Sequence, residues 1–232
     1  ISRFSARLDA ELEAWRTREL KVKLRYVLFD ARWEKCRRDG MIVDMAVLVA
    51  IGVCEQGYRH VLGVETGWGE SQQVWSEFIG GLKKRGLGEV ELFTSDNHCG
   101  IRAALRAHYS GIPWQRCQYH FLQNALDKVP RKREQQIREG LERIWRKQNT
   151  AEQARARLDE LIEELAGPLP EVADWLSEQA PQTLTVFRAA PPPHRKRLRT
   201  TNSVERIHQE LKRRSKPDRI LPNPDRCERL FA

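Results

Sequence analysis

The sequence predicts a mixed α/β fold that is interrupted, late in the chain, by an all-helical segment. Between residues 26 and 64 the apolar residues have the spacing of β-strands. From residue 70 helical spacing alternates with short strand-like runs, and from 131 to 180 helical spacing continues without a strand signal. This order favours a mixed sheet over an all-parallel one.

The first part of the chain is predicted to form one helix and then an antiparallel meander. Residues 8–19 have a thin apolar stripe at helical spacing. Short Gly-containing links at 39–40 and 55–57 favour antiparallel pairing of the runs that they join. Strands are expected over residues 26–29, 42–53 and 58–64. The first of these strands, "YVLF", is expected to end on Asp30.

The second part is predicted to alternate helices and strands. The strand "VELFTSD" also ends on an acid, Asp96. After the helical segment, the proline-rich "AAPPPHRKR" predicts an extended, stiff return. Helices are expected from residue 70 to about 86, over 101–108, over 119–129 and over 203–214, with a short strand "PWQRC" before the third.

Positive charge is concentrated in one stretch. The chain carries a net charge of +9, and residues 194–216 contain nine Lys or Arg and two Glu. A local excess of this kind favours a polyanionic partner, although a solvated basic face has the same composition.

The number of cysteines and the length of the apolar runs indicate the cellular compartment that we expect for the protein. Five cysteines, an odd number, without a signal-peptide pattern favour free thiols in a reducing cytosol. The longest apolar run, residues 45–53, is too short to cross a bilayer. We therefore expect a protein without a membrane partner.

Three acids can be interpreted either as turn and helix-cap residues or as ligands of a metal ion. Asp30 is typical of a turn, Asp96 of a helix cap, and Glu205 follows Asn202 at capping-box spacing. Alternatively, two strand-ending carboxylates meet at one sheet edge with a cation between them, and Glu205 completes the set. Spacing alone leaves both interpretations open.

Five ordered blocks resemble those of the Mutator-type transposases of bacterial insertion sequences. They are "RRDGMIVDMAVLVAIGV", "LGVE", "TSDNHCGIRAAL", "WQRCQYHFLQN" and "LRTTNSVERIHQELKRR". The resemblance implies an RNase H-like mixed sheet with flanking helices and a helical insertion before the last catalytic acid. It also implies an Asp-Asp-Glu triad that maps onto Asp30, Asp96 and Glu205, which would bind two Mg²⁺ or Mn²⁺ ions.

Further residues are candidates for contact with DNA or for positions near the three acids. Phosphate contacts are expected from the cations that flank Glu205: Arg195, Lys196, Arg197, Arg199, Lys212, Arg213 and Arg214. The family pattern draws attention to Cys117 and His120, for which zinc binding, packing and DNA contact stay open. His98 either orients water or phosphate near Asp96 or is merely exposed.

The resulting hypothesis is a DDE transposase that cleaves and joins insertion-element ends on double-stranded DNA, the terminal inverted repeats and the target. It would form a homo-oligomer on DNA and act in the bacterial cytoplasm, at the nucleoid. The alternatives are a truncated, inactive DNA-binding remnant and an RNase H-like nuclease. The expected division is an amino-terminal helical remnant (1–22), a first catalytic part (23–128), the helical insertion (129–193) and a return of the core (194–232), which is expected to be truncated.

Overall fold

The computed structural model describes residues 3–146, 150–216, 220–223, 226 and 229–230. Its contacts divide the chain into two compact units, each of which is described separately. Unit 1 comprises Ile1–Val90, Asn97–Ile112 and Asn202–Ala232, and unit 2 comprises Glu91–Asp96 and Pro113–Thr201.

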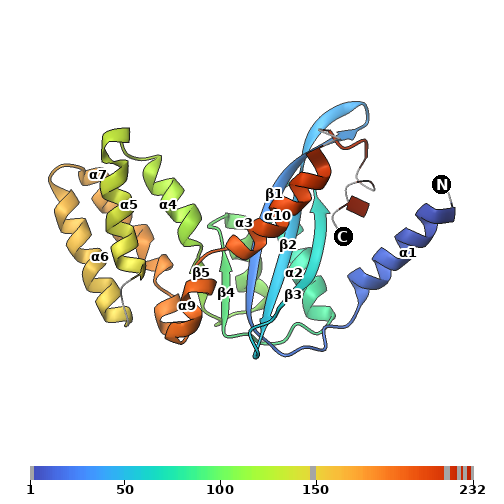
Figure 1. The fold of residues 1–232 in the computed structure, drawn as a ribbon, viewed down its shortest axis with the longest axis horizontal. Coiled ribbons are helices and arrows are strands. Elements are labelled where there is room, and N and C mark those ends of the chain that lie inside the picture. Colours follow the sequence, from blue (N-terminus) through green and yellow to red (C-terminus); the bar gives the residue numbers. More distant parts are fainter. Residues whose placement is uncertain (1–2, 147–149, 217–219, 224–225, 227–228, 231–232) are drawn as a thin grey trace. The chain divides into compact units, whose positions relative to one another are not determined.

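Unit 1 is built on an antiparallel meander, as the sequence predicts (Figure 1). Its strands are β1 (Leu24–Arg38), β2 (Met41–Cys54) and β3 (Arg59–Gly67). Asp39 and Gly40 both have positive φ, +49° and +80°, and Arg38 pairs with Met41 across them. This is the two-residue turn whose twist matches that of a hairpin.

The predicted end of the first strand is wrong. Strand β1 continues through Asp30, which pairs with Val49 of β2, and ends only at Arg38. The physical reason is the Asp39–Gly40 turn, because a two-residue hairpin loop requires both strands to reach it. Asp30 is therefore a residue in the middle of a strand, and a turn role for it is excluded.

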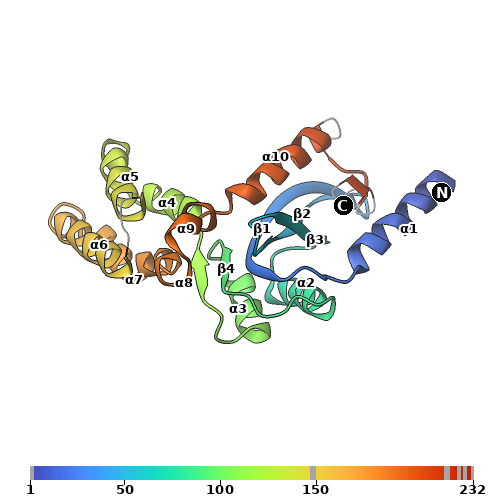
Figure 2. The ribbon, with the colours of Figure 1, turned by 60° about the horizontal axis from the view of Figure 1, so that its bottom comes forward.

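Helices complete unit 1. They are α1 (Arg3–Thr17), α2 (Gln72–Lys84), α3 (Cys99–His108) and α10 (Asn202–Ser215). Helix α2 packs on the meander through aromatic rings: Phe29 of β1 lies edge-to-face with Trp75 and Phe78 of α2, at centroid distances of 6.2 and 6.4 Å. Helix α10 contacts β1 and β2, and both ribbon views show it alongside them (Figures 1 and 2).

Unit 2 contains a short parallel strand pair and a group of helices. Strand β4 (Leu92–Ser95) pairs in parallel with β5 (Trp114–Arg116). The helices are α4 (Gln118–Leu126), α5 (Arg131–Arg146), α6 (Ala151–Ala166), α7 (Pro170–Gln179), the 3₁₀ turn Ala180–Thr183, α8 (Val186–Ala189) and α9 (Pro192–Leu198). Antiparallel and parallel pairing thus both occur among the five strands, with helices before, between and after them. The predicted mixed α/β class, with an all-helical segment late in the chain, is confirmed, and its RNase H-like character stays a prediction.

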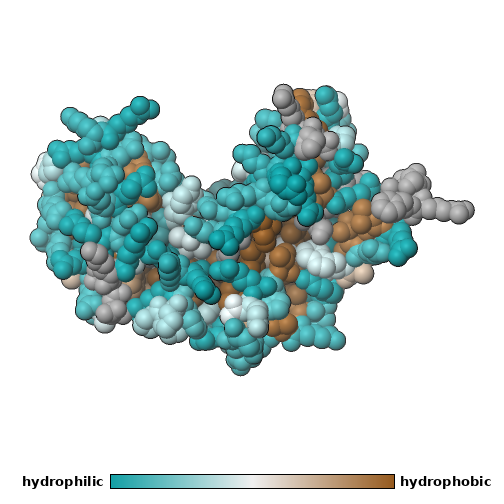
Figure 3. All heavy atoms as spheres, viewed as in Figure 1, coloured by the Kyte–Doolittle hydropathy of each residue, from teal (hydrophilic) through white to brown (hydrophobic). Residues whose placement is uncertain are grey.

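The helices of unit 2 are joined by a buried polar centre at Thr183. Its hydroxyl accepts from the Trp145 indole at 3.0 Å, and its carbonyl accepts from the amides of Gln115 and Gln118, both at 2.9 Å. Phe121 stacks on Trp175 at 4.9 Å. The face of α5 to α7 that Figure 3 shows is largely hydrophilic, with apolar side chains visible between the helices.

The predicted extended return is also wrong. Pro192 and Pro193 occupy the first turn of α9, and only Pro191 before it is extended. Proline is well suited to a first helical turn, because φ is already set and no intrahelical bond from its nitrogen is needed there. The first cations of the predicted basic stretch therefore lie on helix α9.

Candidate active site: the acids and the last helix

Asp30 is a carboxylate in an otherwise apolar strand segment. It follows four buried residues, and its own exposure is 5%. The Nδ1 atom of His208 on α10 lies 3.4 Å from its Oδ2 atom. Because burial of a carboxylate is costly unless partners compensate it, this position is typical of a functional group rather than of a solvated turn acid.

Helix α10 presents one face to the strands, and Glu205 lies beside that face. Val204 and Leu211 are buried, at 0% and 6% exposure, and His208 lies between them with a side-chain exposure of 12%. Residues three apart on a helix are neighbours on its surface. Glu205 therefore lies one turn before the residue that contacts Asp30, on the same side of the helix.

An arginine from β1 holds this part of α10. The Nη1 atom of Arg32 donates to the carbonyl of His208 at 2.7 Å, and its Nε lies 2.6 Å from Glu34. Neither Arg32 nor His208 is predicted from the sequence. The three-residue spacing from Glu205 is a signal for His208, whereas nothing in the local pattern points to Arg32.

Asp96 follows β4 directly and belongs to unit 2. It is half-buried, and its carbonyl accepts from the Ser95 hydroxyl at 2.8 Å. The capping alternative for Asp96 is wrong, because His98 is the N-cap of α3 and its Nδ1 accepts from the Gly100 amide at 3.3 Å. That bond gives His98 a structural role.

The three acids are distributed over both units. Asp30 and Glu205 belong to unit 1 and Asp96 to unit 2. Within the described ranges, no three His, Cys, Asp or Glu side chains form a group that could hold a metal ion. The donor chemistry of Asp30 and Glu205 does fit a hard cation such as Mg²⁺, which takes carboxylate oxygens. The three-carboxylate site stays a prediction.

Cys117 has a packing role. Its sulfur is fully buried at the start of α4, 3.5 Å from the Thr201 hydroxyl, and it accepts from the Thr201 amide at 3.4 Å. The His120 ring is half-buried and lies edge-on to Tyr119, with ring centroids 5.5 Å apart. The fifth cysteine, Cys227, lies outside the described residues.

The predicted DNA-binding cations differ in how they are held. Lys196, Arg197 and Lys212 are exposed. Arg213 and Arg214 both bind the Glu210 carboxylate, at 2.8 and 3.0 Å, and these bonds lower the pKa of Glu210 to about 2. Arg195 and Arg199, in contrast, are bound by backbone carbonyls.

Comparison with known proteins identifies the family. The family model described as "Transposase, Mutator family" matches residues 1–232. The chain belongs to this family. It is 42% identical over its whole length to a protein described as the transposase for insertion sequence element IS406 of Burkholderia multivorans, and 31% identical to the transposase for IS256 in transposon Tn4001 of Staphylococcus aureus.

This Mutator-family chain spans 59% and 60% of the length of those two relatives, respectively. Among solved structures it is similar to the HTLV-2 integrase catalytic core domain in complex with magnesium. That match has 12% sequence identity and a TM-score of 0.25, and it covers 57% of this chain and 92% of the other. None of the helices in the described residues has the length and apolar character needed to cross a membrane.

Proposed function

We propose that this chain is the catalytic part of a DDE transposase, which cleaves and joins the DNA ends of an insertion element. The relatives are transposases of insertion sequences. The observation that carries the proposal is the docking of α10, whose His208 contacts the buried Asp30 one turn after Glu205. An acid from β1 and an acid from α10 thus lie on facing elements of one unit.

The residues have distinct roles in this proposal. Strand β1 and His208 orient the Asp30 carboxylate, Arg32 fixes the register of α10, and α10 carries Glu205. Asp96 completes the triad from the end of β4. Two Mg²⁺ or Mn²⁺ ions held by these carboxylates would stabilise the charge that develops on the attacking and leaving oxygens of a phosphodiester.

The partners follow from the same reaction. The substrates are double-stranded DNA ends, which are the terminal inverted repeats, and the target DNA. The exposed cations of α9 and α10 contact their phosphates and so position the strand. A homo-oligomer assembled on DNA would pair two ends, and the setting is the bacterial cytoplasm at the nucleoid.

Strand transfer by variants of the two facing acids tests this function. Asp30→Asn and Glu205→Gln each remove one anionic ligand while keeping a similar shape. Since metal stabilisation of the transition state is worth several kcal/mol, we expect a loss of about 10²- to 10³-fold in the rate of element-end cleavage and joining.

The matched control is Asp44→Asn. Asp44 is an acid of the neighbouring strand β2 with a side-chain exposure of 60%, and its carboxylate lies 3.3 Å from the amine of the exposed Lys35. We expect its rate to match the wild type. Normal strand transfer by Asp30→Asn would refute the proposal. If the wild type binds DNA without cleaving it, the inactive remnant is favoured. If the wild type cleaves DNA without joining it, the nuclease is favoured.

A further inference from the structure

The peptide that carries Asp96 is held by a short chain of hydrogen bonds within unit 2. The indole Nε1 of Trp114, on β5, donates to the Ser95 hydroxyl at 2.9 Å. That hydroxyl donates in turn to the carbonyl of Asp96 at 2.8 Å. We call this set of Trp114, Ser95 and the Asp96 carbonyl the Asp96 relay. It ends on the backbone of a residue that the proposed function assigns to metal binding.

The direction of both hydrogen bonds is fixed by the groups themselves. An indole nitrogen only donates and a carbonyl oxygen only accepts, whereas a serine hydroxyl can do either. In the bond from Trp114 the Ser95 oxygen must therefore be the acceptor, which leaves its proton for the Asp96 carbonyl. Ser95 is fully buried, at 0% exposure, so water does not compete for the hydroxyl. The hydroxyl satisfies both partners in one orientation.

The parallel strand pair sets the geometry of the Asp96 relay. Trp114 pairs with Phe93, and Ser95 lies two residues further along β4, so the three side chains are on one face of the pair. The long indole side chain spans this offset. The Ser95 backbone is fixed as well, because its carbonyl accepts from the Cys117 amide at 2.7 Å. The ladder therefore holds the serine that holds Asp96.

The residue after Asp96 is also fixed, by a contact within unit 1. Asn97 accepts through Oδ1 from Nη1 of Arg102 at 2.9 Å. The half-buried Asp96 thus lies between two residues whose side chains are both hydrogen-bonded. Since a side chain has only a few staggered rotamers, fixing the peptide limits the positions that the Asp96 carboxylate can take.

We propose that Ser95 and Trp114 are positioning residues for Asp96, which hold its peptide so that the carboxylate meets the metal ion in one orientation. The inference rests on the proposed function, because it takes Asp96 to be a metal ligand. Both residues act through Asp96 and not on the substrate. Partners of this kind behind a metal ligand typically contribute about 10- to 100-fold to metal affinity or activity.

Variants of the two positioning residues test the Asp96 relay. Ser95→Ala removes the hydroxyl, and Trp114→Phe removes the indole donor. We expect Ser95→Ala to lower the Mn²⁺ affinity, and the rate of strand transfer at saturating DNA, by about 10- to 100-fold, and Trp114→Phe to lower both in the same direction. The affinity for DNA measured in EDTA should match that of the wild type. Wild-type Mn²⁺ affinity and rate in either variant would overturn the proposal.

The double variant distinguishes a relay from two separate packing contacts. If Trp114 acts by orienting the Ser95 hydroxyl, removing the indole adds nothing once the hydroxyl is gone. We therefore expect Ser95→Ala/Trp114→Phe to have the Mn²⁺ affinity and the rate of Ser95→Ala. Losses that multiply in the double variant would overturn the relay.

Thr94→Val is the matched control. The Thr94 hydroxyl is also buried and also donates to a carbonyl at 2.8 Å, but that carbonyl belongs to Leu198. Because Thr94 directly precedes Ser95 on β4, its side chain is on the other face of the strand pair. We expect Thr94→Val to keep the wild-type rate and Mn²⁺ affinity. A loss equal to that of Ser95→Ala would overturn the specific role of Ser95.

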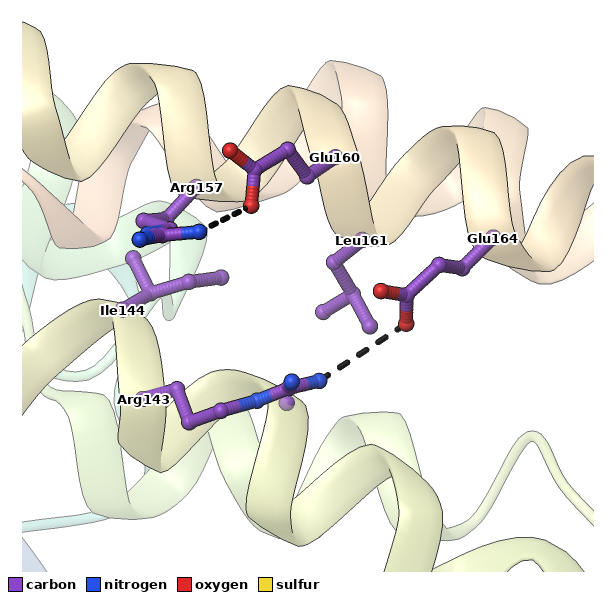
Figure 4. Close-up of a pocket in the computed structure, with 7 residues that line it drawn as sticks. Arg143, Ile144, Arg157, Glu160, Leu161 and Glu164 are labelled. Carbon is purple, nitrogen blue, oxygen red and sulfur yellow. Dashed lines mark hydrogen bonds and ion pairs between the residues drawn. The ribbon is translucent and has the colours of Figure 1, made fainter.

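A second control separates positioning from a general loss of stability. Ile144 lines a cavity between α5 and α6, in which Arg143 and Arg157 are paired with glutamates of the same lining (Figure 4). Its exposure is 1%, and Ile144→Val costs about as much stability as the loss of one hydrogen bond. We expect it to lower the urea midpoint but to leave the rate and the Mn²⁺ affinity unchanged. A loss of rate equal to that of Ser95→Ala would attribute the effect to instability and overturn the proposal.

Asp96→Asn separates the positioning role from the proposed function. If Asp96→Asn loses Mn²⁺ affinity and strand transfer while Ser95→Ala retains both, the proposed function stands and the positioning role is refuted. If Asp96→Asn itself retains both, the proposed function fails, and the positioning role fails with it.

Discussion

Gly100 sits where a side chain has no room. It is the second residue of α3, and a Cβ atom there would overlap the carbonyl oxygen of Glu70 and lie 2.9 Å from the Ser71 carbonyl carbon. These are backbone atoms at the start of α2, where Ser71 is the N-cap, so no side chain can rotate away. Gly100→Ala must therefore push α2 and α3 apart.

The expected change in the free energy of unfolding of Gly100→Ala results from two opposing effects. Alanine gains about 1 kcal/mol over glycine inside a helix. Overpacking typically costs about 1–3 kcal/mol, and contact with rigid backbone places Gly100→Ala toward the upper end, for a net loss of about 1–2 kcal/mol. Gly81→Ala in α2 is the control, since no atom lies within 4 Å of its added Cβ and only the gain remains.

Urea unfolding followed by circular dichroism measures the difference. We expect Gly81→Ala to be more stable than Gly100→Ala by about 2–3 kcal/mol, with equal m-values. Equal stability of the two variants would show that α2 and α3 do not approach as closely as the structure indicates.

Two further predictions concern unit 1. Burial raises the pKa of Tyr109, whose hydroxyl donates to the Leu87 carbonyl at 2.7 Å, to about 12, so its stabilising contribution is complete below about pH 10 and is lost as the pH rises toward 12. Urea unfolding at pH 9 and at pH 12 measures this loss. Between these two pH values, the free energy of unfolding should fall by about 2–3 kcal/mol more for the wild type than for Tyr109→Phe. Equal decreases for the two proteins would contradict a buried phenol at Tyr109. Arg32→Ala removes the charged donor to the His208 carbonyl, worth about 1.5–3 kcal/mol, so amide exchange in α10 should accelerate by about 10- to 100-fold. Unchanged exchange there, with β1 to β3 as the internal reference, would show that Arg32 does not hold the helix.

Local signals predict most of the elements. The links at 39–40 and 55–57 correctly predict the meander, and the helix expected from residue 70 to about 86 corresponds to α2 (Gln72–Lys84). The length of β1 was also predictable, because a two-residue Asp-Gly turn fixes where both strands end. The apolar run alone stops at Phe29, so it predicts a strand that ends too early, on Asp30.

Tertiary contacts account for what the sequence does not predict. A proline-rich composition is compatible with both an extended segment and a first helical turn. In the structure the segment is helical, and Leu198 at its end is buried, with an exposure of 2%. Arg32 contacts His208 across 176 positions of sequence. Arg195 and Arg199 were predicted as DNA-binding cations from charge, but their carbonyl partners become visible only when α5, α8 and α9 fold together.

We propose that Asp30, Asp96 and Glu205 act as one metal site, which calorimetric titration with Mn²⁺ can test. We predict two ions per wild-type chain and a loss of affinity of more than about tenfold in Asp30→Asn, Asp96→Asn and Glu205→Gln alike, with Asp44→Asn unchanged. Wild-type Mn²⁺ binding by Asp96→Asn, alongside a loss in Asp30→Asn, would contradict the claim.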